Sequence, residues 1–124
     1  MPIVDIVLVA DASGSGTAVL AQSLADTVGR ALKSPPGQTW VRMHVLPRDH
    51  YAENESPVDL TEPPVFVIVL KRTVPAKADL AVEVSALTEA IAQVLGRATN
   101  CVHVEYAPAA GGRFSFGGNF VEQE

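Results

Sequence analysis

Four short runs rich in β-branched side chains recur along the chain. The first is apolar apart from Asp5, and the third is apolar throughout. Runs of this length and composition predict β-strands, and continuously apolar ones predict buried strands. We expect strands at Pro2–Val9, Trp40–Leu46, Pro64–Leu70 and Cys101–Tyr106.

Two segments between these runs carry apolar residues at helical spacing instead. The first follows Ser13–Thr17, whose hydroxyls are typical N-cap groups, and ends before Pro35–Gly37. We expect a helix of about 17 residues there and a second helix later, each with one apolar stripe. The stripes are Leu20, Leu24, Val28, Ala31 and Leu32 in the first helix and Leu80, Val84, Leu87, Ile91 and Leu95 in the second.

The order strand, helix, strand therefore occurs twice, and the second copy follows about 62 residues after the first. Pro2 aligns with Pro64, and Pro47 aligns with Pro108. We interpret the chain as one α/β (α+β) domain over 1–124 that contains a tandem β-α-β duplication. Its units cover about 2–51 and 64–124, joined by a polar linker at 52–63.

Such a duplication predicts a four-stranded sheet with an uncovered face. A right-handed crossover places each helix on one face of its strand pair, so two helices cover one face only. Yet Val65–Leu70 is apolar on both faces, which is typical of a sheet covered twice. We expect another chain to supply the second cover; the alternative is a merely hydrophobic edge strand.

Composition narrows the class of protein. The 124 residues are 48% hydrophobic and 19% charged, with a net charge of −5, which excludes wholesale disorder and disfavours nucleic acid and anionic membranes as partners. The single cysteine, Cys101, excludes a disulfide framework and indicates a reducing compartment. The longest apolar run is too short to span a bilayer, and no basic leader precedes Asp5. We expect a cytoplasmic domain.

The first candidate for chemistry is Pro2. Removal of Met1 leaves proline with a secondary amine at the start of a buried strand. An α-amino group has an ordinary pKa of about 8, and burial or neighbouring cations lower it, as a general base near pH 7 requires. The alternative is a proline that simply starts a strand.

Basic residues supply the second set of candidates. Arg42 lies inside an otherwise apolar strand, where its guanidinium fits a substrate carboxylate or, alternatively, an internal ion pair with Asp5. Lys71 and Arg72 follow the third strand at its carboxyl end, where sites gather in sheets with crossover helices. The alternative for these two is simple solvation.

The last candidates lie near the C-terminus, where Gly111–Gly118 holds two aromatic residues between glycine pairs. This pattern predicts a short hairpin that closes over a site, or alternatively a flexible tail. Its candidate side chains are Arg113, Phe114 and Phe116.

Taken in order, these features resemble the tautomerase superfamily, which includes 4-oxalocrotonate tautomerase and macrophage migration inhibitory factor. The resemblance covers essentially the whole chain. It implies that Pro2 is the catalytic base, that Arg42 acts in catalysis, and that substrate binds to Arg72, Phe114, Lys71, Phe116 and Arg113. It further implies a homotrimer, a small carboxylate substrate and chemistry without metal or organic cofactor.

The reaction implied is keto–enol proton transfer on a 2-oxo acid, with dehalogenation, decarboxylation or a non-catalytic trimer as alternatives. Ala12 stands where the one-unit enzymes carry a further arginine. Pro64 has no amine, and His103 replaces the arginine in the second copy, so we interpret His103 as structural. Retained Met1 would block Pro2.

Some residues admit other interpretations. Asp11–Ser15 matches a metal motif of adhesion domains, and Gly14–Gly16 weakly resembles a phosphate loop. Helix capping explains the first motif better. The second lacks the lysine of a Walker loop and the third glycine of a dinucleotide fingerprint. We interpret His44 and His50 as strand or surface histidines, Cys101 as core filler, and Tyr51 and Tyr106 as candidate pocket residues.

Overall fold

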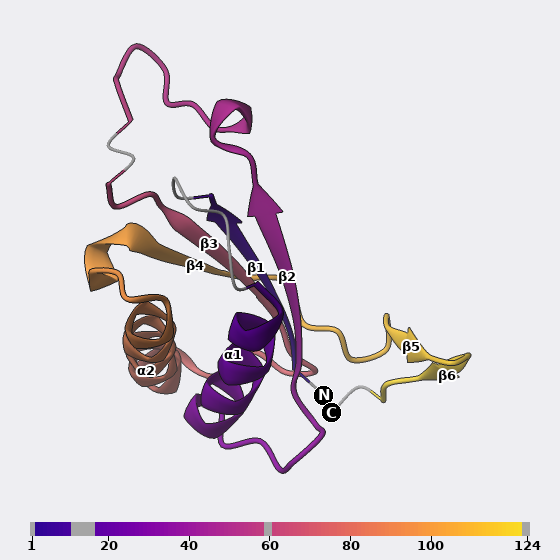
Figure 1. Ribbon diagram of the computed structural model, residues 1–124. Coiled ribbons are helices and arrows are strands. Elements are labelled where there is room, and N and C mark those ends of the chain that lie inside the picture. The colour runs from indigo at the N-terminus through magenta and orange to yellow at the C-terminus, as the bar shows by residue number, and fades with distance from the viewer. Residues whose placement is uncertain (1, 11–16, 59–60, 123–124) are drawn as a thin grey trace.

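The computed structural model describes residues 2–10, 17–58 and 61–122. Four strands form one sheet with the order β2-β1-β3-β4 (Figure 1). The strands are β1 (Ile3–Val9), β2 (Trp40–Leu46), β3 (Val65–Leu70) and β4 (Val102–Tyr106). The predicted strands are confirmed to within a residue at their ends; Cys101 belongs to the 3-10 turn η2 (Thr99–Cys101) that precedes β4.

The pairing of the strands reflects the duplication. β1 is parallel to β2 and β3 is parallel to β4, as two β-α-β units require, whereas β1 and β3 run antiparallel. Both units thus contribute to one sheet, and the β1–β3 ladder joins them. In this ladder Ile3 pairs with Leu70 and Leu8 with Val65.

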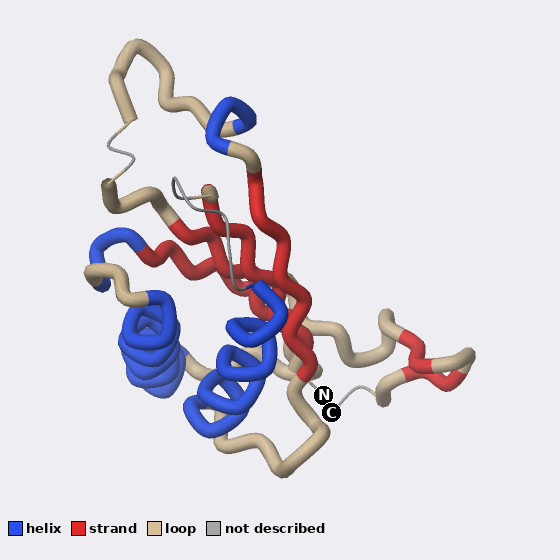
Figure 2. The backbone as a smooth tube through the Cα atoms, in the orientation of Figure 1, coloured by secondary structure: helices blue, strands red, loops and turns tan. Residues whose placement is uncertain are grey.

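Two helices, α1 (Thr17–Ala31) and α2 (Lys77–Leu95), cover the same face of the sheet (Figure 2). The middle of each predicted stripe is buried: Leu24 and Val28 of α1 and Leu87 and Ile91 of α2 have no exposed surface. Leu20 and Leu80, which begin the two stripes, are half-buried. α2 ends at Gly96, whose φ of 65° is a left-handed conformation that glycine adopts at little cost. The predicted N-cap of α1 lies outside the described residues. None of the helices in the described ranges is long and apolar enough to cross a membrane.

The core lies between these helices and one face of the sheet. Alternate strand residues point into it, as the two-residue period of a strand requires. The buried strand residues in this cluster are Val4, Ile6, Leu8, Val65, Val67, Val69 and Val102.

No helix of the described part of the chain covers the opposite face. Phe66 and Ile68 of β3 alternate with buried valines, and 38% and 39% of their surfaces are exposed. Trp40, at the start of β2, is 53% exposed. The prediction that β3 is apolar on both faces is confirmed, and within the single chain the outer face is open.

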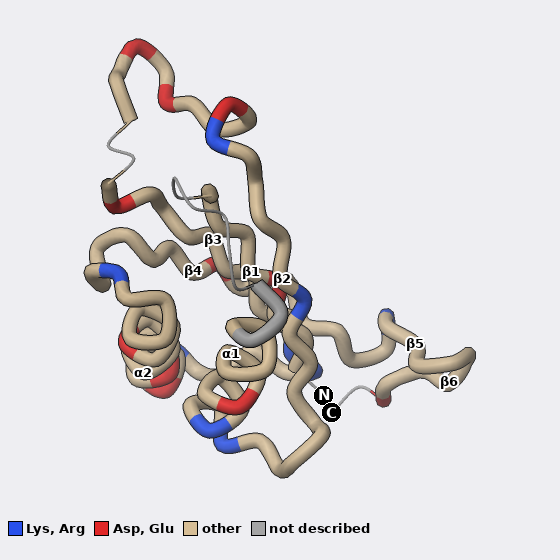
Figure 3. Tube along the Cα trace, in the orientation of Figure 1, with Lys and Arg blue, Asp and Glu red and all other residues tan. Residues whose placement is uncertain are grey.

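Two excursions leave the sheet. The polar segment between β2 and β3 begins with the 3-10 turn η1 (Arg48–His50) and carries a series of acidic residues (Figure 3). The second excursion is the predicted hairpin, β5 (Ser115–Phe116) and β6 (Asn119–Phe120), which projects from the body (Figure 1). Backbone bonds from Val121 to Phe114 and from Gly112 to Val121, both 2.7 Å, close its base.

Truncation of the core should separate buried from exposed positions on α2. We expect Ile91→Ala to lower the free energy of unfolding by about 2–5 kcal/mol, because it leaves a cavity. The matched control Val82→Ala, at a residue 71% exposed, should change it by less than about 0.5 kcal/mol. Urea titrations at one protein concentration measure both, and equal losses would contradict the packing described.

Candidate functional site

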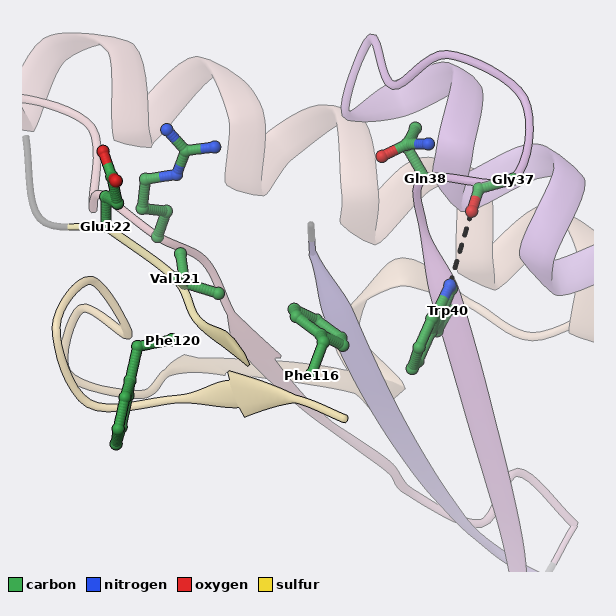
Figure 4. Close-up of a pocket in the computed structure, with 8 residues that line it drawn as sticks. Gly37, Gln38, Trp40, Phe116, Phe120, Val121 and Glu122 are labelled. Carbon is green, nitrogen blue, oxygen red and sulfur yellow. Dashed lines mark hydrogen bonds between the residues drawn. The ribbon is translucent and has the colours of Figure 1, made fainter. Parts of the chain in front are cut away.

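A pocket of about 500 Å³ lies at one end of the sheet (Figure 4). Its size is ordinary for a small-molecule site. Three parts of the chain enclose it: the loop into β2, the end of β3, and the hairpin with the segment after it. The lining residues are Gly37, Gln38, Trp40, Arg72, Phe116, Phe120, Val121 and Glu122.

The sheet register explains why these parts meet. Ile3 pairs with Trp40 in the parallel ladder and with Leu70 in the antiparallel ladder. The start of β1, the start of β2 and the end of β3 therefore lie at one end of the sheet. Of the predicted site residues, Arg72 and Phe116 line the pocket there.

Pro2 lies next to this pocket. It is buried, and its carbonyl oxygen accepts a hydrogen bond of 3.0 Å from the backbone N–H of Trp40. It is not itself among the lining residues. A single backbone hydrogen bond thus connects Pro2, the predicted base, to Trp40, whose side chain forms part of the pocket wall.

Trp40 is a pocket residue that sequence reasoning missed. Its indole Nε1–H donates to the Gly37 carbonyl at 3.3 Å, and its ring meets Phe116 edge-on with centroids 5.0 Å apart. Phe116 in turn contacts Phe114, 4.8 Å away between centroids. Figure 4 shows Phe116 between the hairpin and Trp40. The signal that could have identified Trp40 as a pocket residue was a large aromatic side chain at the first position of a predicted strand.

Arg42 is bound to a carboxylate of this chain and does not line the pocket, whereas the predicted role requires contact with a substrate carboxylate. It lies on the uncovered face, 71% exposed, and forms two hydrogen bonds to the carboxylate of Asp5, at 2.6 and 2.9 Å. The hydrogen bond and the charge of Asp5 raise the pKa of Arg42. The register places these residues opposite each other, so the alternative of an internal ion pair is what the structure has.

Lys71 also has a partner within the chain. Its Nζ lies 2.8 Å from Glu83 of α2, and the Tyr106 hydroxyl donates to the other oxygen of the same carboxylate. Burial and the bond to Glu83 raise the pKa of Tyr106. Neither Lys71 nor Tyr106 lines the pocket.

Arg113 and Phe114 support the hairpin. The Arg113 guanidinium donates twice to the Ala109 carbonyl, at 3.0 and 2.7 Å, and lies outside the pocket lining. Phe114 reaches the pocket only through Phe116. The sequence therefore identified the hairpin correctly but did not distinguish its wall residue from its supporting ones.

The remaining candidates lie elsewhere. His103 and Tyr51 flank Phe66 on the uncovered face, with centroids 5.3 and 6.0 Å from its ring. The Tyr51 hydroxyl donates to Glu53 at 2.7 Å, and this hydrogen bond raises the pKa of Tyr51. Cys101 is half-buried rather than core.

The motifs at Asp11–Ser15 and Gly14–Gly16, and Ala12 with them, fall outside the described residues. Within the described ranges, no group of three His, Cys, Asp or Glu side chains is arranged to hold a metal ion.

The architecture was compared with known proteins. No protein-family model matches the chain, and no curated protein is significantly similar to it in sequence. Solved structures do match over nearly the whole chain. A fused 4-OT described as an asymmetric trimer has a TM-score of 0.74 at 19% identity, covering 95% of this chain and 94% of that one. The fold is that of the tautomerase superfamily.

Two further solved structures also match nearly the whole chain. Pt0534, inactivated by 2-oxo-3-pentynoate, matches with a TM-score of 0.74 at 18% identity over 96% of this chain and 94% of that one. A malonate semialdehyde decarboxylase inhibited by 3-bromopropiolate matches with a TM-score of 0.68 at 17% identity over 92% and 88%. At these identities the likeness establishes the fold.

The Trp40–Phe116 contact predicts a spectroscopic signal, because Trp40 is the sole tryptophan. We expect Phe116→Leu to shift its fluorescence emission to longer wavelength, since water reaches the exposed indole edge; such ring contacts contribute about 0.5–1.5 kcal/mol. Phe120→Leu, at a residue 67% exposed on the same hairpin, is the control and should leave the emission near wild type. Emission unaffected by either change would contradict the contact.

Proposed function

We propose that this protein is a cofactor-independent keto–enol tautomerase that acts on a small 2-oxo acid, with Pro2 as general base after removal of Met1. The observation that carries the proposal is the meeting of Arg72 and Phe116 in a pocket beside buried Pro2. The tautomerase fold, shared with a protein inactivated by a 2-oxo acid, supports it.

The proposed reaction is a proton relay through one amine. The neutral Pro2 nitrogen removes a proton from the hydroxyl of the enol, or from the carbon next to the ketone, and becomes a secondary ammonium ion. It then returns the proton to another carbon of the dienol system, which restores the free amine. The Arg72 guanidinium binds the substrate carboxylate and stabilises developing enolate charge. Phe116 and Trp40 exclude water, which keeps the amine neutral and strengthens these interactions.

The assembly we propose is a cytoplasmic homotrimer. The uncovered sheet face, with Phe66 and Ile68 about two-fifths exposed, needs a cover that the described residues do not supply. Trimeric fused 4-OT structures with the same fold support this arrangement. Arg42 lies on that face, so we propose that it reaches a substrate carboxylate in the assembled protein by exchanging Asp5 for it.

A second function has one specific observation in its favour. Glu122 lines the same pocket and supplies a carboxylate, which hydrolytic dehalogenases and decarboxylases of this fold class use to activate water. The likeness to malonate semialdehyde decarboxylase is in keeping with it. If Met1 is retained, the amine is blocked and a non-catalytic trimer becomes the appropriate function.

The test is the ketonisation of an aryl enolpyruvate, followed by ultraviolet absorbance, in protein whose intact mass proves that it begins at Pro2. We expect Pro2→Ala to lower kcat by about 10²-fold, the lower end of the usual contribution of a positioned base, because alanine keeps a primary amine but lacks the ring that fixes its position. Equal rates in wild type and Pro2→Ala would contradict the assignment. Turnover of malonate semialdehyde or a 3-haloacrylate with no enolpyruvate activity would favour the second function.

Arg72 can be tested separately from the base. We expect Arg72→Ala to raise KM about ten- to hundredfold, because hydrogen bonds to charged groups contribute about 1.5–3 kcal/mol. Arg30→Ala, which removes an arginine bonded to Thr27 on α1, is the charge-matched control and should leave KM unchanged. Equal KM values in the two variants would remove Arg72 from the site.

A further inference from the structure

Glu83 of α2 binds two side chains that the proposed chemistry does not use. One carboxylate oxygen is 2.8 Å from Lys71 Nζ, and the other accepts a hydrogen bond from the Tyr106 hydroxyl. The side chains of Lys71 and Glu83 are 19% and 15% exposed, so the ion pair is largely removed from water. One carboxylate thus connects a helix to two neighbouring strands.

Both strands lead directly into the pocket wall. Lys71 immediately follows β3 and precedes the pocket residue Arg72, while Tyr106 ends β4 and precedes the segment that becomes the hairpin. Backbone bonds then tie the two exits together. The N–H of Ala110 donates to the Lys71 carbonyl at 2.8 Å, and that of Gly111 donates to the Arg72 carbonyl at 3.1 Å.

We propose that Glu83 is a positioning residue: by holding Lys71 and Tyr106 together, it sets Arg72 and the aromatic hairpin at the distance that a small carboxylate substrate requires. The substrate named in this inference rests on the proposed function. The contacts of Glu83 are observed independently of that function. Glu83 is not among the residues that line the pocket, and it acts through the residues that it holds.

A carboxylate suits this role because it has two acceptor oxygens, one for each donor. Glu83 must accept hydrogen bonds at two separate oxygens, one from an ammonium and one from a phenol. A glutamine of the same shape has a single acceptor oxygen, so it satisfies one donor and meets the other with its own N–H₂ group. Because the phenol oxygen of Tyr106 can accept from that N–H₂ group, Glu83→Gln keeps contacts to both strand ends but removes the charge of the ion pair with Lys71. Glu83→Ala releases both strand ends.

A merely structural role predicts a different pattern of effects. Lys71 and Glu83 lie outside the buried apolar cluster of the fold, and Tyr106 only packs against its edge. Loss of the three-group contact should consequently alter the position of the strand exits more than the global unfolding equilibrium.

The experiment compares Glu83→Gln and Glu83→Ala with Glu89→Ala, a control at an exposed glutamate on the same helix. The first readout is Trp40 fluorescence, which senses Phe116 of the hairpin and needs no substrate. We expect a shift to longer wavelength in Glu83→Ala, a smaller one in Glu83→Gln and none in Glu89→Ala. A tyrosinate absorbance titration should show a lower pKa for Tyr106 in both Glu83 variants, because its acceptor is lost.

The second readout is the steady-state kinetics of enolpyruvate ketonisation. We expect KM to rise about tenfold in Glu83→Ala with kcat changed less than about twofold, since substrate placement is affected and the base is not. Glu83→Gln should recover part of this loss. A lowered urea midpoint with wild-type emission and KM would overturn the inference in favour of a purely structural contact, as would wild-type values throughout.

The two proposals fail in distinguishable ways. If Pro2→Ala loses activity while Glu83→Ala keeps wild-type KM and emission, the tautomerase assignment stands and the role of Glu83 is refuted. If the wild type has no activity but Glu83→Ala shifts the emission of Trp40, the positioning role stands and the reaction is refuted.

Discussion

The antiparallel ladder between β1 and β3 is the constraint on which the rest of the structure depends. Parallel strands within each β-α-β unit bring like ends together, whereas this one ladder brings the start of β1 beside the end of β3. Pro2 and Arg72 consequently lie at the same end of the sheet although 70 residues separate them in sequence. In a parallel ladder, the start of β1 and the end of β3 would lie a strand length apart. Pro2 and Arg72 could then not lie at the same pocket.

Packing on the two faces of the sheet follows from the same topology. Because both helices cross on one side, the residues of β1 and β3 that face them are buried. On the other face Phe66 and Ile68 of β3 are exposed, and Asp5 and Val7 of β1 are half-buried. The open face carries Phe66 and Ile68 together with the Asp5–Arg42 pair. Exposed aromatic and aliphatic side chains beside an ion pair suit a protein interface better than they suit water.

Much of this fold could be predicted from the sequence, because period-two runs and helical stripes are local signals. The bounds of β2 were predicted to the residue, since proline and glycine precede it and Pro47 follows it. The partners of the charged residues could not be predicted in the same way. Whether Arg42 binds Asp5 depends on the strand register, and the Lys71–Glu83 pair depends on how α2 lies across β3. The candidate residues could be identified from their type and their position in the sequence. Their roles could not be assigned without knowing the distances between elements that are far apart in sequence.

The duplication has a consequence at the opposite end of the sheet. Since the units are joined antiparallel, an approximate two-fold axis relates Pro2 to Pro64, which is also buried at the start of its strand. There the Arg97 guanidinium donates to the Pro63 carbonyl at 2.6 Å and to the Val9 carbonyl at 3.4 Å. At this end of the sheet, a guanidinium bound to two backbone carbonyls lies near Pro64, whereas at the other end the pocket lies beside Pro2. Circular permutation that joined the present termini and opened the chain before Pro64 would move the amino terminus from Pro2 to this corner.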